Sequence, residues 1–190
     1  MTKYFNNRTL VLALALSTTM FASNAFSADI ATIPVTATVQ NAISLNVVTP
    51  MSFGTIYAIA NGTQTASAVL STASVQSYTR TAAPAIAGLV SGVPSAAEIT
   101  VVGVSGATIN LTINGVVNPV GPVDGDILTL HSFTADINGA GSAPRVIGTP
   151  FSYTATASDT ILIGASLRTP LQASIEDGLY EGQFNLVASY

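Results

Sequence analysis

Residues 31–48 read ATIPVTATVQNAISLNVV, and apolar and polar side chains alternate along most of this stretch. The odd positions carry, in order, Ile33, Val35, Ala37, Val39, Asn41, Ile43, Leu45 and Val47. A period of two is typical of a β-strand with one buried face. The run is much longer than an ordinary strand of about 17–20 Å. The question is therefore whether the apolar face of this segment packs into the core of its own domain or into the core of another molecule.

The segment before it has the features of a secretory signal peptide. Lys3 and Arg8 precede a short apolar stretch from Leu10 to Ala22, and small residues follow it. This pattern is too short and wrongly flanked for a transmembrane helix. We expect residues 1–27 to be removed, with cleavage after Ala25 or Ser27.

The expected organisation follows from that cleavage. Residues 28–41 form an N-terminal extension and residues 42–190 form one domain. We expect the protein to be exported through the inner membrane to the periplasm and then to the cell surface, with no direct membrane span.

The remaining chain is poor in charge. Its only basic residues are Arg80, Arg145 and Arg168, against nine acidic residues, and it has no cysteine. Nucleic acid and anionic lipid both require a basic surface, so the composition excludes them as partners. Disulfides and thiol-bound metals are excluded as well. Because charged residues are depleted where surface becomes buried in partners, the composition also points to assembly.

Period-two alternation interrupted by Gly, Pro and Asn predicts an all-β fold without helices, of the sandwich or barrel type. The expected strands are Phe53 to Ile59, EITVVGV, ATINLTING, ILTLHSFTADI and TILIGASLR, the last with a bulge at Gly164. Asn61-Gly62 predicts a hairpin turn. Loops are expected at residues 118–126 and 138–145.

The chain ends in a further alternating segment, GLYEGQFNLVASY. One face of this strand carries Tyr180, Gly182, Phe184, Leu186, Ala188 and Tyr190. Chain ends usually fray unless they are docked. We therefore expect a fully paired strand in the interior of its sheet.

Three segments resemble a known family: MSFGTI, ITVVGVSGATINLTI and ILIGASLRTPLQASIEDGLYEGQFNLVASY. Together they are similar to the secreted bacterial domain of unknown function forty-four-oh-two, whose members end in G-x-Y-x-G-x-F-x-V-x-V-x-Y. The matching positions are Ile163, Gly164 and Leu167 in the penultimate strand, and Gly178, Tyr180, Gly182, Phe184 and Tyr190 in the last.

This family is similar in outline to fimbrial adhesins and pilins of the chaperone–usher type. The resemblance implies an immunoglobulin-like, pilin-type antiparallel β-sandwich that acts as a structural subunit of a surface fibre. Assembly would be by donor-strand complementation, and the partners would be further copies of the chain, a periplasmic chaperone and an outer-membrane usher. The chain differs from the best-known pilins in lacking a cysteine pair and in ending on its Tyr.

Specific residues acquire expected roles from this resemblance. Residues 29–40 would be the donor strand, with Ile33, Val35, Ala37 and Val39 facing the acceptor. The C-terminal strand would flank the acceptor groove and pair with the chaperone through Tyr180, Phe184, Leu186 and Tyr190. The alternative is that residues 31–48 form one bent strand, or two strands, of their own domain.

No catalytic, cofactor-binding or metal-binding residues are expected, and we predict that the protein is not an enzyme. His131 lies in an alternating run and has no G-x-S-x-G partner motif. Asp124-Gly125-Asp126 lacks the further ligands of a calcium loop and is expected to be a turn. The adjacent Glu176 and Asp177 would point apart and are expected in a solvated turn.

Two other classes of function remain open. Alternate apolar residues before a final aromatic residue also describe the last strand of an outer-membrane β-barrel. The third class is a monomeric secreted module that binds carbohydrate or protein through its loops, near Tyr78, Phe151 and Tyr153.

Overall fold

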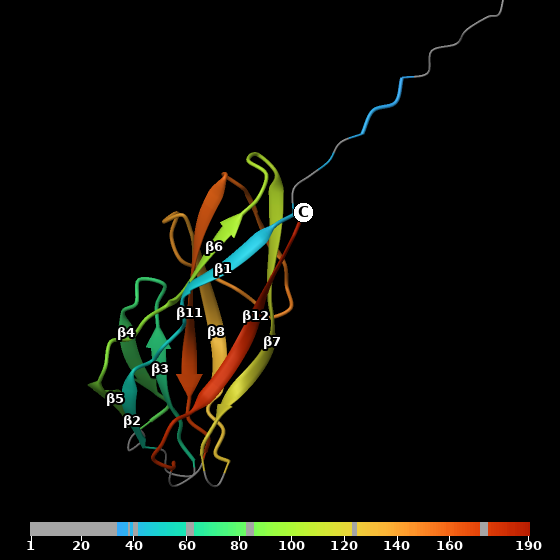
Figure 1. Ribbon diagram of the computed structural model, residues 1–190. Helices are drawn as coiled ribbons and strands as arrows, with labels where there is room; N and C mark the ends of the chain where they lie inside the picture. Colours follow the sequence, from blue (N-terminus) through green and yellow to red (C-terminus); the bar gives the residue numbers. More distant parts are fainter. Residues whose placement is uncertain are drawn as a thin grey trace, which may run out of the picture. The chain divides into compact units, whose positions relative to one another are not determined.

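The computed structural model is an all-β, antiparallel sandwich (Figure 1). It describes residues 34–37, 39, 42–59, 63–82, 86–122, 125–171 and 175–190. The chain divides into two units, Met1–Thr38 and Val39–Tyr190. As predicted, no helix occurs in the described ranges, and therefore none that is long and apolar enough to cross a membrane.

The larger sheet is organised around one central strand, β11 (Ser158–Arg168). One edge of β11 pairs with β6 (Ala97–Val102) along its first half and with β3 (Ala66–Leu70) along its second half. The other edge pairs with β8. The remaining members of this sheet are β1 (Ser44–Thr49), β4 (Gln76–Arg80), β8 (Thr129–Ile137) and β9 (Ala143–Pro144).

The second sheet contains three strands in the order β10-β7-β12. These are β10 (Phe151–Thr154), β7 (Thr108–Val120) and β12 (Glu181–Ser189). Two further strands, β2 (Thr55–Ile59) and β5 (Ile86–Ser91), pair only with each other in the described part of the chain.

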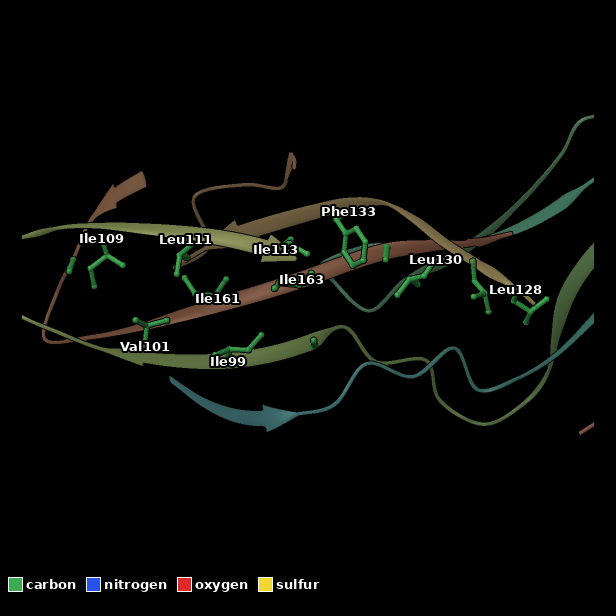
Figure 2. Packing of buried hydrophobic residues seen from close by; sticks show 14 residues of the cluster. Ile99, Val101, Ile109, Leu111, Ile113, Leu128, Leu130, Phe133, Ile161 and Ile163 are labelled. Carbon is green, nitrogen blue, oxygen red and sulfur yellow. The ribbon is translucent and has the colours of Figure 1, made fainter. Parts of the chain in front are cut away.

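The core lies between the two larger sheets. Alternate residues of β6, β7, β8 and β11 point into it, and Figure 2 shows these side chains converging. Its fully buried large members include Val101, Ile109, Leu111, Ile113, Phe133, Ile161 and Ile163. The buried residues of these strands thus follow the period-two alternation of their sequences.

The prediction that residues 118–126 form a loop is wrong for its first three residues. β7 continues to Val120 because it takes up extra residues relative to β12 at two places, between Asn114 and Val117 and between Val117 and Val120. Gly115, with φ +56, lies at the first of these bulges. A proline is tolerated at a bulge, so Pro119 does not end the strand.

The prediction of an interior C-terminal strand is also wrong. Among the described residues β12 pairs only with β7, so it is an edge strand of its sheet there. Alternation of side chains reports which face is buried, and it carries no information on how many neighbours a strand has.

The bulge predicted at Gly164 has a more specific form. The register of β11 against β8 shifts between Gly164 and Ser166, and the extra residue lies on β8, where Ser132 has φ +52. Gly164 lies where β11 changes partner from β6 to β3. A Cβ at this position would overlap the carbonyl oxygen of Leu70, so the close approach requires glycine.

Candidate functional site

An open groove of about 1060 Å³ lies between β12 and β2. On one side it is lined by residues 52–58 without a break, and on the other by residues 175–184 and Leu186. A strand that presents one face to a cavity contributes alternate residues, because its side chains alternate. Consecutive lining residues therefore mean that the backbone edges of β2 and β12 border the groove.

Both of these edges lack a strand partner within the described ranges. β12 pairs with β7 on its other side, and β2 pairs with β5 on its other side. Unpaired N–H and C=O groups on a strand edge are a template for pairing with another chain. The groove therefore has hydrogen-bonding capacity along both walls.

The floor of the groove is apolar. It is formed by side chains that belong to the main core or pack against it, and these include Ala97, Ile99, Leu128, Leu130, Leu167, Met51, Phe53, Ile56, Ile175, Phe184 and Leu186. The volume slightly exceeds the range of about 300–1,000 Å³ typical of small-molecule pockets. The groove thus reaches side chains of the hydrophobic core along this line.

Two residues of β1, a strand of the larger sheet, also have inward-facing side chains that remain exposed. Leu45 is opposite Val101, and Val47 is opposite Ile99, so each pair shares one face of the sheet. Val101 and Ile99 are 0% and 5% exposed, whereas Leu45 and Val47 are 37% and 66% exposed. The inward side of β1 is therefore left uncovered by the described residues.

Three of the four C-terminal residues singled out from the sequence lie on the groove wall: Tyr180, Phe184 and Leu186. The Phe184 ring packs edge-on against Phe133, with centroids 5.1 Å apart, which holds β12 against the core. The Tyr180 hydroxyl donates to the carbonyl oxygen of Glu176 at 3.1 Å. Burial raises the pKa of Tyr180, and the nearby carboxylates of Asp126 and Glu176 raise it further.

The fourth residue, Tyr190, lies outside the groove lining. Its hydroxyl accepts a hydrogen bond from the backbone N–H of Val104 at 2.9 Å. This contact ties the end of β12 to the connection between β6 and β7. Tyr190 therefore positions the strand that forms the groove wall.

The candidate donor residues lie in the segment before β1. Val35 and Val39 are 90% and 89% exposed, and Ala37 is exposed too. Pro34 to Ala37 adopt no regular secondary structure. Ile33 lies outside the described residues. The three described members of the set thus present their side chains to solvent.

Acidic residues border one end of the groove: Glu176, Asp177 and Glu181. The buried Asp126 carboxylate accepts a hydrogen bond from the backbone N–H of Glu176 at 3.0 Å, which anchors this segment. Within the described ranges, no group of three His, Asp or Glu side chains has a geometry that could hold a metal ion. Asp124 lies outside the described residues.

A second polar cluster was not anticipated from the sequence. Asp159 is 1% exposed and accepts hydrogen bonds from the Thr156 backbone N–H at 3.0 Å, the Thr156 hydroxyl and the Asn138 amide at 2.7 Å. Burial raises the pKa of Asp159, but these hydrogen bonds outweigh it and hold the pKa below its usual value. The cluster joins the connections after β8 and after β10, so its role is in stability.

The other residues weighed from the sequence lie apart from the groove. His131 is half-buried on β8, and its Nδ1 lies 2.7 Å from the Ser132 hydroxyl. Burial, and then the charge of Arg168, lower the pKa of His131. Tyr78, Phe151 and Tyr153 lie in strands β4 and β10 and not in loops.

Comparison with known proteins identifies one family. The family model described as "Domain of unknown function (DUF4402)" matches residues 43–190. No significant match was found among curated proteins or solved structures. The matched range contains all the strands found in the described residues, including both walls of the groove. This chain belongs to the DUF4402 family.

Proposed function

We propose that this protein is a structural subunit of a bacterial surface fibre. In this assembly, residues 29–40 of one copy fill the groove of the next copy and pair with β12. The observation that carries the proposal is the uncovered groove: Leu45 and Val47 face inward but remain exposed, and Val47 lines the same groove as β12, whose second edge has no partner strand in the described residues.

The chemistry of the groove defines its occupant. An apolar floor between two strand edges fits an extended segment with apolar side chains at alternate positions. Val35, Ala37 and Val39 provide this pattern, and the residues between them are Thr36 and Thr38. The segment is uncharged from Ile30 to Gln40, so it brings no charge into the apolar floor.

The energetics allow stable docking if the groove is formed in advance. Burying Val35 and Val39 is worth roughly 1.5–3 kcal/mol each, and each new backbone hydrogen bond adds about 0.5–1.5 kcal/mol. Ordering the segment costs about 1–2 kcal/mol per residue. A groove whose apolar floor and β12 wall are already in place lowers the remaining cost, which favours binding.

The same features support an immunoglobulin-like sandwich of pilin type that lacks one strand. Such an open subunit needs protection before assembly, which is the part a periplasmic chaperone plays before an outer-membrane usher receives the subunit. The free edge of β12 is the natural strand for the chaperone to pair with. Replacing both Phe184 and Leu186 by Ser is expected to abolish this pairing, and unchanged co-purification with a periplasmic partner would contradict it.

Fibre formation is tested most simply in the donor segment. The double variant Val35→Asp, Val39→Asp is expected to be exported and folded but unable to form fibres visible by electron microscopy. The matched control is Thr36→Asp, Thr38→Asp, which adds the same charge on the other side of the strand. Normal fibres from the valine variant would refute the proposal, and so would equal loss in both variants.

A further inference from the structure

We propose that the β2–β5 ribbon is a movable wall of the groove, which closes on the inserted strand and pairs with it through the free edge of β2. The strand from a second copy would then be bonded to β12 on one side and to β2 on the other. This inference rests on the proposed function and deepens it.

In the described residues the ribbon has no backbone pairing with either larger sheet. β2 pairs with β5 along Thr55–Ile59, and in the described part of the chain neither strand pairs with a third. Ala58 of β2 and Ala87 of β5 pack with Ala66 of β3 and Tyr78 of β4, and Ile56 of β2 packs against the main core. The ribbon is therefore held by side-chain packing and not by a backbone ladder.

One end of the ribbon is attached through two glycines that face each other. Gly54 precedes β2 with φ +65, and Gly92 follows β5 with φ +87. A Cβ on Gly92 would lie 3.3 Å from the Cα of Gly54. Residues that tolerate large changes of φ and ψ at the ends of elements are the usual hinges of moving segments.

The chain on the body side of these glycines is fixed. Ser52 and Ser95 exchange two backbone hydrogen bonds, each of 2.9 Å. The two serines lie just outside the glycines in the sequence, before Gly54 and after Gly92. The hydrogen-bonded Ser52–Ser95 pair therefore fixes the chain at the base of the ribbon, and the two glycines lie between this fixed pair and the ribbon.

The inserted strand itself needs a hydrogen-bonding partner on the side that faces β2. A strand inserted beside β12 uses the hydrogen-bonding groups of one edge and leaves those of its other edge facing the β2 wall. Alternate N–H groups of β2 point away from β5, since in a two-stranded ribbon each strand bonds its partner through every second residue. Pairing these two edges would join the β10-β7-β12 sheet to the β2–β5 ribbon through the inserted strand.

Hydrogen exchange measured residue by residue tests the inference. The acceptor is the exported chain carrying Val35→Asp and Val39→Asp, so that its own arm does not compete. The probe is a synthetic peptide of the natural residues 29–40. We expect exchange to slow about tenfold or more in β12 and at alternate residues of β2, as for newly formed backbone hydrogen bonds.

The outcomes separate this inference from the function on which it rests. Slower exchange in β12 with unchanged exchange in β2 would overturn the movable wall and leave the proposed function intact. Unchanged exchange in both strands at saturating peptide would overturn both.

A glycine variant tests the hinge directly. Gly92→Ala restricts the hinge, and Gly139→Ala is the matched control because Gly139 also has positive φ, +72, with no atom within 4 Å of an added Cβ. We expect Gly92→Ala to bind the peptide several-fold more weakly and to lose the protection of β2. Equal peptide affinity and equal β2 protection in the two variants would overturn the hinge.

Discussion

The replacement Val47→Asp gives the sharpest single test of the open groove. Val47 is on the inward side of β1 and lines the groove, but it is 66% exposed in the isolated subunit. Its neighbour Val48 is 51% exposed and does not line the groove, so Val48→Asp adds the same charge on the same strand as a control.

The expected magnitude follows from these exposures. Full burial of a valine is worth about 1.5–3 kcal/mol, and only a third of the Val47 surface is buried in the subunit. Val47→Asp should therefore lower the free energy of unfolding by no more than about 1 kcal/mol. In the assembled fibre the other two-thirds of the Val47 surface would be buried, so the variant loses about 1–2 kcal/mol of the free energy gained by this burial.

Desolvation of the carboxylate adds a further cost to docking. Removing an unpaired charge from water costs at least a few kcal/mol even after local relaxation. The total penalty of about 3–5 kcal/mol corresponds to a loss of affinity of two to three powers of ten or more.

The assay is titration calorimetry with the peptide of residues 29–40, together with thermal unfolding of each variant. We expect Val47→Asp to unfold near the natural temperature but to bind the peptide at least about a hundredfold more weakly. Val48→Asp should bind normally. Equal affinity of the Val47 variant and the natural chain would refute the reasoning, because the groove would then not extend under β1.

Three further predictions concern the scaffold that holds the groove. Asp159→Asn should lower the free energy of unfolding at neutral pH by about 2–3 kcal/mol through lost charge-assisted hydrogen bonds. The folded-state pKa of Asp159 lies below its usual value, so this stabilisation is present above the unfolded-state pKa near 4 and is lost as the pH falls through the folded value. The free energy of unfolding, measured by chemical denaturation at a series of pH values, should therefore change less with pH in the variant than in the natural chain. Parallel curves for the two proteins would contradict the assignment. Gly164→Ala should lower the free energy of unfolding by at least about 2 kcal/mol, because the added methyl group overlaps the Leu70 carbonyl oxygen. An unchanged melting temperature would show that the β3 backbone can shift to make room for the methyl group. Tyr190→Phe removes the acceptor of the Val104 N–H and should speed hydrogen exchange at the end of β12 by a few-fold, whereas unchanged exchange would mean that packing of the ring alone holds the terminus.

The sequence predicts the buried faces of this fold well, because a strand in a sandwich shows its environment in every second residue. The alternation in ATINLTING places Ile109, Leu111 and Ile113 on one face of the strand, and all three are fully buried. The same logic identified the inward side of the last strand, where Phe184 and Leu186 pack on the core.

What the sequence could not provide is the number of neighbours of each strand. β12 alternates as regularly as an interior strand, but its second edge has no partner strand in the part of the chain that the structure describes. Pro119 would ordinarily end a strand, and only the pairing of β7 with β12 reveals that it lies at a bulge. The Asp159 cluster depends on Asn138, which is distant in the sequence, so no local motif points to it.

Disulfide trapping between two copies tests the central claim most directly, because the natural chain contains no cysteine. One copy carries Val47→Cys in the groove, and the other carries a single cysteine at position 35, 37 or 39 of the arm. Bonding requires Cβ atoms about 3.5–4.5 Å apart, so only an arm residue seated in the groove will react. The account predicts a mixed dimer for at least one arm position with Val47→Cys and for none with Val48→Cys. Absence of any mixed dimer in assembled material, or equal trapping at both groove positions, would contradict the claim that one copy's arm completes its neighbour's core.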